Sequence, residues 1–230
     1  MLGLITARGG SRGIPQKNVR PVAGQPLIAW TIAAARRART LTRIILSTDD
    51  PAIAEVGRQH GVEVPFLRPA ELAGPDSPHV PVALHALDWL AANEGYRPGY
   101  LVLLQPTSPL RTAADIDAAV ELAVARSASA VVSVEAAPSH PYLTYRVGPT
   151  GELEAFVPCD LGYRRRQDLP PAFALNGAVY VVRCDELRRQ RTFLPDGALA
   201  YEMPPERSLD VDSPWDLHLA DLILRSEGRA

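Results

Sequence analysis

A glycine-rich stretch near the start of the chain has the composition of a site that binds phosphate groups. The segment ARGGSRGIPQKN, residues 7–18, directly follows the apolar run LGLITA. It offers backbone N–H groups and polar side chains that can neutralise a triphosphate from several sides, at Arg8, Gly9, Gly10, Ser11, Arg12 and Lys17. The lysine does not follow a glycine directly, and GGSRG lacks the GxGxxG spacing. The segment therefore predicts a phosphate-binding loop that is neither a Walker A loop nor a dinucleotide fingerprint.

The chain has 24 lysine and arginine residues, and Lys17 is the only lysine among them. An ammonium is a compact point charge, whereas a guanidinium is a planar fork. A lysine kept at this one position suggests a site that needs the compact group. The alternative is chance in a chain whose composition favours arginine.

Asp210 and Asp212 are the second pair of residues that could do chemistry. They lie two apart in SLDVD, residues 208–212, which we expect to form a strand. On a strand both carboxylates share one face, about 7 Å apart. Two like charges there are costly without a cation, and Mg²⁺ suits oxygen ligands. Aspartates that cap the following helix are the alternative, so the magnesium prediction depends on the phosphate-binding loop beside it.

The elements that must position these residues alternate along most of the chain. Expected strands cover residues 2–7, 43–48, 99–105, 128–135, 177–182, 199–203 and 208–212, and expected helices cover 26–38, 51–61, 80–94, 116–126 and 213–226. Continuously apolar strands that alternate with helices predict a mostly parallel α/β sheet covered on both faces. Ligands bind such sheets beyond the carboxyl ends of the strands, where the phosphate-binding loop falls.

Between about residues 138 and 175 this alternation stops. Prolines, aromatic residues and the cluster Arg164-Arg165-Arg166 replace it, and TYRV and ELEAFV predict two strands of a small antiparallel flap. The chain shows no internal repeat and no flexible linker. We therefore expect one domain over residues 1–230 with an inserted flap.

The composition excludes several classes of protein. The 230 residues are 47% hydrophobic and carry a net charge of −2, which argues against a nucleic-acid or membrane-surface binder. No apolar run is long enough to span a membrane, and the start lacks the features of a signal peptide. Cys159 and Cys184 lack metal-ligand spacing, which favours a reduced cytoplasmic protein. The five histidines are scattered, and Ser108 lacks the GxSxG pattern of a hydrolase nucleophile.

Six segments together resemble one known family. They are ARGGSRGIPQKN (7–18), RIILSTDD (43–50), LRPAELA (67–73), LLQPTSPLRT (103–112), RRQDLPPAFALNGAVY (165–180) and SLDVDSPWDL (208–217). In this order, and over almost the whole chain, they are similar to the N-acylneuraminate cytidylyltransferases, also called CMP-sialic acid synthetases.

The resemblance implies a Rossmann-like nucleotidyltransferase fold, a three-layer sandwich whose small antiparallel flap serves dimerisation. It implies a Mg²⁺-dependent reaction in which the anomeric hydroxyl of a nonulosonic sugar acid attacks the α-phosphorus of CTP. Pyrophosphate leaves and a CMP-sugar forms. It also implies a homodimer in which the flap is exchanged between subunits.

The resemblance assigns roles residue by residue. The nucleotide is expected to contact Arg8, Gly9, Gly10, Ser11, Arg12, Lys17, Asn18, Ser77 and His79. The sugar acid is expected to contact Gln105, Arg165, Arg166 and Asn176, with Arg165 or Arg166 reaching its carboxylate or the neighbouring subunit's site. Mg²⁺ is expected to bind Asp210 and Asp212. Catalysis is assigned to Lys17, Arg8 and Gln105.

Three positions depart from the family pattern. Ala174 stands where an arginine is common, His79 where a serine is common, and Leu143 near a position where some members carry a lysine. Two of these changes remove positive charge from the acceptor side. They leave a second hypothesis, in which the chain is a sugar-1-phosphate nucleotidyltransferase that uses CTP or GTP. A third hypothesis, from another class, is a nucleotide-binding protein without catalysis.

Overall fold

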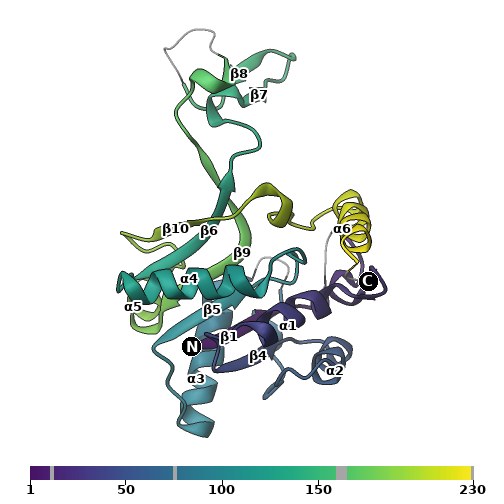
Figure 1. The fold of residues 1–230 in the computed structure, drawn as a ribbon, viewed down its shortest axis with the longest axis vertical. Helices are drawn as coiled ribbons and strands as arrows, with labels where there is room; N and C mark the ends of the chain where they lie inside the picture. The colour runs from purple at the N-terminus through teal and green to yellow at the C-terminus, as the bar shows by residue number, and fades with distance from the viewer. Residues whose placement is uncertain (11–12, 75–76, 159–164, 229–230) are drawn as a thin grey trace.

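A computed structural model describes residues 1–10, 13–74, 77–158 and 165–228 of the chain. A six-stranded sheet in the order β10-β6-β9-β5-β1-β4 forms its centre (Figure 1). The strands are β1 (Leu2–Thr6), β4 (Arg43–Ser47), β5 (Tyr100–Leu104), β6 (Ala130–Ala136), β9 (Phe173–Arg183) and β10 (Leu199–Glu202). β1 pairs in parallel with β4 and β5, and β6 pairs in parallel with β10. The sheet is therefore mostly parallel, as the sequence predicts.

Strand β9 is antiparallel to both of its neighbours, β5 and β6. It runs this way because β6 leads up into the flap and β9 returns from it, so the two strands form one long hairpin. Its register against β6 shifts between Val132 and Val134. Such a bulge bends the strand and redirects the side chains beside it.

Helices cover both faces of the sheet, which makes three layers. The helices α1 (Leu27–Arg37), α2 (Pro51–Gln59) and α4 (Ala113–Ala125) pack against one face through residues such as Ile32, Ile53 and Ile116. The helices α3 (His79–Glu94) and α5 (Cys184–Gln190) cover the other face through Leu90 and Leu187. These side chains are at most 3% exposed, so both interfaces are closed to water.

The last helix, α6 (Pro214–Ser226), packs on a separate cluster with Trp30 of α1. This cluster also takes in the short pair β2 (Pro21–Val22) and β3 (Gln25–Pro26) through Val22. It places the C-terminal helix beside the N-terminal glycine-rich segment. The contact brings the distant stretches 13–22 and 211–224 to one end of the molecule (Figure 1).

Side-chain caps fix where the helices of the site begin. Thr112 caps α4, and its hydroxyl and the carboxylate of Asp115 form a reciprocal capping box. Asp115 stands at the third position of the helix, so α4 begins three residues before the expected start at 116. Ser213 and Asp216 form the same box at α6, and Asp50 caps α2 ahead of Pro51. Each box satisfies backbone donors that the first helical turn leaves free.

The expected strand over residues 208–212 is wrong. Residues 203–213 are all described and contain only a 3₁₀ turn, η5 (Pro205–Arg207). Pro204 and Pro205 follow β10, and a proline cannot donate a hydrogen bond to a neighbouring strand. The chain therefore leaves the sheet before it reaches Asp210.

The flap, residues 138–175, stands away from the body on the β6–β9 hairpin (Figure 1). Its strands β7 (Tyr145–Val147) and β8 (Leu153–Ala155) pair antiparallel, as TYRV and ELEAFV predict. All six residues of the two strands are exposed. The flap thus has no buried face of its own among these strands.

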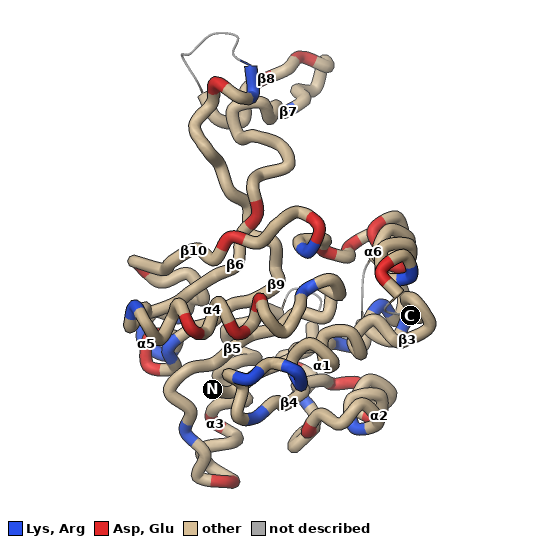
Figure 2. The backbone as a smooth tube through the Cα atoms, viewed as in Figure 1, with Lys and Arg blue, Asp and Glu red and all other residues tan. Residues whose placement is uncertain are grey.

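Charges are spread over the body. In Figure 2, blue and red segments are interspersed along its helices and turns. Among the described residues, no helix is long and apolar enough to cross a membrane.

Candidate active site

A cavity of about 450 Å³ opens at the carboxyl ends of β1 and β5. It is lined by Thr6, Arg8, Gly13, Lys17, Asn18, Arg68, Ser77, His79, Val82, Gln105, Pro106, Thr107, Asp210 and Asp212. The parallel pairing of β1 with β4 and β5 puts the loops after these strands at one sheet edge. This is where an open α/β sheet binds its ligands.

The start of the glycine-rich segment is held by polar contacts to neighbouring loops. The backbone N–H of Gly9 donates to Asp49 Oδ1 at 3.2 Å, and Arg8 Nη1 donates to the carbonyl of Gly74 at 3.0 Å. A Cβ on Gly9 would come within 2.6 Å of Asp50 Oδ2, so this position needs a glycine. The buried amide of Asn18 donates to the carbonyl of Arg8 at 3.0 Å. These contacts hold the described parts of the segment, on both sides of positions 11 and 12, against their neighbours.

Lys17 lies between the loop and the C-terminal acidic pair. Its Nζ donates to the carbonyl of Val211 at 2.8 Å and to Asp212 Oδ1 at 3.0 Å. The lysine side chain is 14% exposed, whereas that of Asp212 is 76% exposed. The contact spans almost the whole sequence and puts an ammonium at the cavity wall beside a carboxylate.

Asp210 is the buried member of the acidic pair. Burial raises the pKa of its carboxyl and the charge of Asp212 adds to this rise, whereas the nearby side chains of Thr107 and Lys17 lower it. Within the described part of the chain, Asp210 Oδ1 is buried and has no hydrogen-bond partner. An orphaned buried acceptor beside a second carboxylate fits a cation ligand.

The donor set favours Mg²⁺ over a soft metal. No cluster of three or more His, Cys, Asp or Glu residues is found where residues are described. Two carboxylates are enough for Mg²⁺, which keeps several waters and takes phosphate oxygens of its substrate. Asp210 and Asp212 therefore fit a magnesium ion that a bound nucleotide helps to hold.

Arg68 is a cavity residue that the residue-by-residue prediction missed, although it lies in the LRPAELA segment. It is 7% exposed, and its guanidinium donates to Ser47 Oγ at 3.1 Å and to the carbonyl of Ser47 at 2.5 Å. Burial lowers its pKa to about 10, so it stays charged at neutral pH. No spacing in the sequence indicates this position, because the chain arrives there from an irregular loop.

His79 begins α3 and faces the cavity opposite the glycine-rich segment. Its Nδ1 lies 3.4 Å from Thr6 Oγ1. Desolvation of the ring at the cavity lowers its pKa, and the charges of Arg68 and Arg8 lower it further, although the residue as a whole is exposed. The imidazole is therefore neutral at pH 7 and can serve a ligand as a hydrogen-bonding group without charge.

Gln105 directly follows β5 and lines the cavity. Gly177 sits beside it with a φ of 73°, a conformation that favours glycine. A Cβ there would meet Asp210 Oδ2 at 3.6 Å and Gln105 Oε1 at 3.8 Å. Behind them the fully buried Arg111 donates to the backbone carbonyls of Gln105 and Ala178 at 3.2 and 2.7 Å. Arg111 thus holds the backbone next to Gln105 and the backbone next to Gly177.

The structure brings most predicted residues together in the cavity, at Arg8, Lys17, Asn18, Ser77, His79, Gln105, Asp210 and Asp212. Gly9 and Gly10 lie next to the lining residue Arg8 in the same loop. Ser11 and Arg12 lie outside the described residues, as does Arg164 of the arginine cluster.

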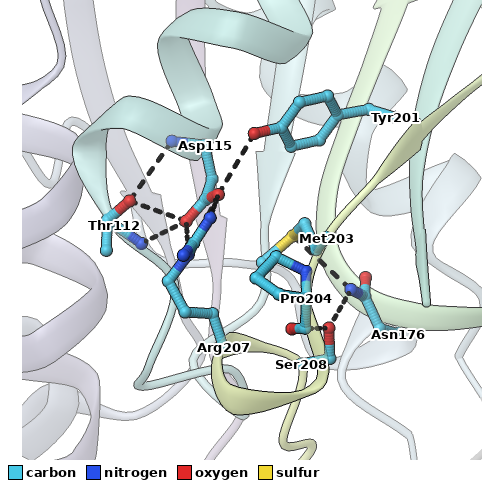
Figure 3. A network of polar contacts seen from close by, with 8 residues as sticks. All are labelled: Thr112, Asp115, Asn176, Tyr201, Met203, Pro204, Arg207 and Ser208. Atoms are coloured by element: carbon cyan, nitrogen blue, oxygen red, sulfur yellow. Dashed lines mark hydrogen bonds and ion pairs between the residues drawn. The ribbon is translucent and has the colours of Figure 1, made fainter. Parts of the chain in front are cut away.

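Three predicted sugar contacts are placed elsewhere. The described lining of the cavity does not include Asn176, Arg165 or Arg166. Asn176 is 2% exposed, and its amide is bonded to Ser208 in a buried network (Figure 3). Arg165 and Arg166 are exposed beside the flap, where Arg166 Nη2 donates to the carbonyl of Ala137 at 2.8 Å. Arg165 and Arg166 were expected to reach the sugar carboxylate or the neighbouring subunit's site, and the roles of these three residues stay predictions.

Comparison with known proteins gives consistent results. A family profile described as "Cytidylyltransferase" matches residues 2–197. The chain is 34% identical over 215 residues to N-acylneuraminate cytidylyltransferase of Streptococcus agalactiae serotype III, with 93% of this chain covered. It spans about half of that relative's length, since the match covers 50% of it. It is 33% identical to CMP-N,N'-diacetyllegionaminic acid synthase of Legionella pneumophila, with 97% of this chain and 96% of that protein covered.

A solved structure shares the fold. It is that of CMP:2-keto-3-deoxy-manno-octonic acid synthetase complexed with CTP, with a TM-score of 0.73 and 16% identity. The superposition covers 98% of both chains. The likeness extends the three-layer nucleotidyltransferase architecture to the whole of the chain.

Proposed function

The chain belongs to the cytidylyltransferase family, and we propose that it condenses CTP with a nonulosonic sugar acid to form a CMP-sugar and pyrophosphate. The observation that carries the proposal is the contact of Lys17 with Asp212 at one cavity wall. The contact supports the proposal because an ammonium that could bind the triphosphate lies beside carboxylates that could bind a metal ion. Relatives whose names include N-acylneuraminate and N,N'-diacetyllegionaminic acid support the acceptor class.

The chain's own residues divide the work at the cavity. Arg8, Lys17 and the loop N–H groups would bind the triphosphate and hold it in line for attack on the α-phosphorus. Asp210 and Asp212 would hold Mg²⁺, which neutralises charge on the phosphate oxygens when it is bound. Reactions of this kind need positioning and charge neutralisation more than a covalent nucleophile.

The other side of the cavity would receive the nucleoside and the acceptor. The buried guanidinium of Arg68 and the neutral imidazole of His79 offer donors for the base and ribose. Gln105 would orient the acceptor at the opposite wall. The proposal includes a cytoplasmic location, where CTP is available.

The acceptor half of the site would be completed by a second copy of the chain. Arg165 and Arg166 are exposed and charged, yet they lie outside the cavity lining of their own chain. The flap that carries them exposes Tyr145, Val147 and Leu153 by 51%, 73% and 67%. Apolar surface of this kind is typical of an interface. A homodimer would cover it and bring an arginine to the carboxylate of the partner's sugar acid.

A sugar-1-phosphate transferase is the second candidate. The positions of Ala174 and Leu143, on β9 and in the flap, carry no positive charge for a carboxylate. This favours an acceptor with a different anionic group.

Pyrophosphate release with CTP and Mg²⁺ tests the proposal. The acceptors are sialic, legionaminic, pseudaminic and ketodeoxynonulosonic acids, with sugar 1-phosphates in separate reactions and the variant Asp212→Asn as the control. Release with a sugar acid is the expected result, and release only with a sugar 1-phosphate supports the second candidate. Silence in every reaction while CTP still binds contradicts both and leaves a nucleotide-binding protein without catalysis.

A further inference from the structure

The irregular segment that carries the acidic pair is fastened at its start by a buried ion pair. Asp115 of α4 is fully buried, and Arg207 bonds both of its oxygens, with Nε at 3.0 Å from Oδ2 and Nη2 at 2.9 Å from Oδ1 (Figure 3). The hydroxyls of Thr112 and Tyr201 donate to the same carboxylate at 2.6 and 3.2 Å. This carboxylate therefore joins α4, β10 and the segment that follows β10.

A second fastening follows one residue later. Asn176 Nδ2 donates to Ser208 Oγ at 3.0 Å, and Ser208 Oγ donates to the carbonyl of Pro204 at 2.9 Å (Figure 3). On its other side, Asn176 Oδ1 accepts from Ser133 Oγ of β6 at 2.6 Å. Asn176 precedes Gly177, the residue beside Asp210 and Gln105. The Asn176 amide thus connects β6, which leads to the flap, with Ser208 at the start of the segment that carries Asp210 and Asp212. Through Gly177 it also adjoins the cavity wall.

Residues 205–212 have few other restraints. They are all described and form no strand, and Val211 N–H donates to the carbonyl of Thr107 at 2.8 Å. Asp212 N–H donates to the cap residue Asp216 at 3.1 Å. Asp210 is therefore held between two sets of contacts, those of Arg207 and Ser208 before it and those of Val211 and Asp212 after it, which include the bonds from Lys17 Nζ.

We propose that Arg207 and Asn176 are positioning residues that fix the 205–212 segment and so set how tightly Asp210 and Asp212 hold a divalent cation with the nucleotide. The inference rests on the proposed function. Mg²⁺ demands near-octahedral geometry, so small movements of its carboxylates weaken it. Loss of groups that orient metal ligands typically lowers metal affinity by about 10–100-fold.

The first test compares CTP affinity with and without metal by calorimetry. For each variant, the Kd for CTP in EDTA is divided by the Kd for CTP in Mg²⁺. This ratio, called the gain below, is the factor by which the metal increases CTP affinity. We expect Arg207→Met and Ser208→Ala to lower this gain by roughly tenfold, in line with other lost orienting groups. The affinity in EDTA should stay near the wild-type value. Arg207→Lys, which keeps a cation, should recover part of the gain.

The matched control is Arg189→Met. Arg189 belongs to an exposed ion pair with Glu186 on α5, away from the acidic segment. It should leave the gain unchanged. An unchanged gain in Arg207→Met and Ser208→Ala as well would overturn the inference.

Because Arg207→Met leaves the Asp115 carboxylate buried without its partner, the double variant Asp115→Asn/Arg207→Met keeps the test informative if the single variant does not fold. Amide hydrogen exchange of the peptide covering residues 205–213 needs neither CTP nor metal. We expect faster exchange there in the double variant and in Ser208→Ala than in wild type and Arg189→Met. Equal exchange overturns the inference, whereas failure of wild type to bind CTP overturns the proposed function.

Discussion

Around the cavity, Asn18, Arg68 and Lys17 are fastened by hydrogen bonds within the chain, whereas in the flap every residue of β7 and β8 is exposed. A two-stranded hairpin without a covered face is at best marginally stable in water. One chain therefore forms by itself the cavity that we propose for the nucleotide. The flap instead exposes apolar side chains that the proposed second copy would cover.

The two regions also differ in what their charges do. Lys17 contacts Asp212 at the cavity wall, and the pair ties the first 20 residues to the last 20. In the flap, the Arg146 guanidinium lies 4.8 Å from the ring centre of Phe156, and Arg165 pairs with the nearby Asp168 at 3.2 Å. The flap contacts are local and exposed, so they cost little to rearrange when a partner binds.

The largest expected effect comes from the nucleotide half. Lys17→Ala and Asp212→Ala should each lower turnover by roughly 100-fold or more, because each removes charge stabilisation from the triphosphate. Lys17→Arg should fail to restore the rate, since a planar guanidinium does not fit the position of a compact ammonium. Steady-state pyrophosphate release measures the loss, and circular dichroism checks the fold.

Arg37→Ala, on the exposed end of α1, is the control for loss of a basic residue. Near-normal turnover in Lys17→Ala would show that the cavity is not the reacting site.

The next effect should come from the apolar surface of the flap. Val147 and Leu153 are opposite each other on β7 and β8. Val147→Asp with Leu153→Asp should convert a dimer into monomers and abolish acceptor-dependent transfer, because charges cannot be buried there without partners. CTP binding should persist. Light scattering measures the oligomeric state, and calorimetry measures CTP binding. A double variant that remains an active dimer would contradict the proposed role of the flap as the dimer interface.

A smaller effect is expected for Arg166→Ala. A charge-assisted hydrogen bond to a carboxylate contributes about 1.5–3 kcal/mol, so kcat/KM for the sugar acid should fall by roughly tenfold or more. The KM for CTP should not change. Initial rates with either substrate varied separate these outcomes, and a selective rise in the KM for CTP would move Arg166 to the nucleotide half.

The smallest effect concerns His79 and pH. Burial and the nearby Arg68 and Arg8 lower its pKa, so the folded protein resists a protonation that the unfolded chain accepts. Stability therefore falls as pH decreases through the ordinary histidine value of 6.5. His79→Ser lacks this penalty, so its Tm relative to wild type should rise between about pH 8 and pH 5.5. A constant difference over that range contradicts the placement of His79.

The sequence predicted the site best where chemistry depends on a local segment. The glycine-rich loop, Lys17 and the acidic pair lie in short motifs, and the parallel strands that carry the loops are continuous apolar runs. Their meeting at one sheet edge follows from the topology of such sheets. The flap strands were likewise visible as short alternating stretches.

Contacts between distant segments could not be predicted in the same way. Arg68 enters the cavity from an irregular loop, and its burial depends on Ser47 of a strand 21 residues earlier. Asn176 was assigned to the sugar acid, yet the bulge in β9 brings its amide to Ser208. The expected strand at 208–212 failed because Pro204 and Pro205 end the preceding strand. The placements of Arg68 and Asn176 depend on tertiary packing that residue patterns do not encode, whereas the two prolines are visible in the sequence.

The central claim is that each site joins the nucleotide half of one chain to the flap of another. Mixed dimers of Lys17→Ala and Arg166→Ala chains, co-expressed with two tags and purified through both, test it most directly. If Arg166 serves the partner's site, the mixed dimer keeps one intact site, and its turnover should far exceed that of either parent homodimer. Turnover no higher than the parents would contradict the claim.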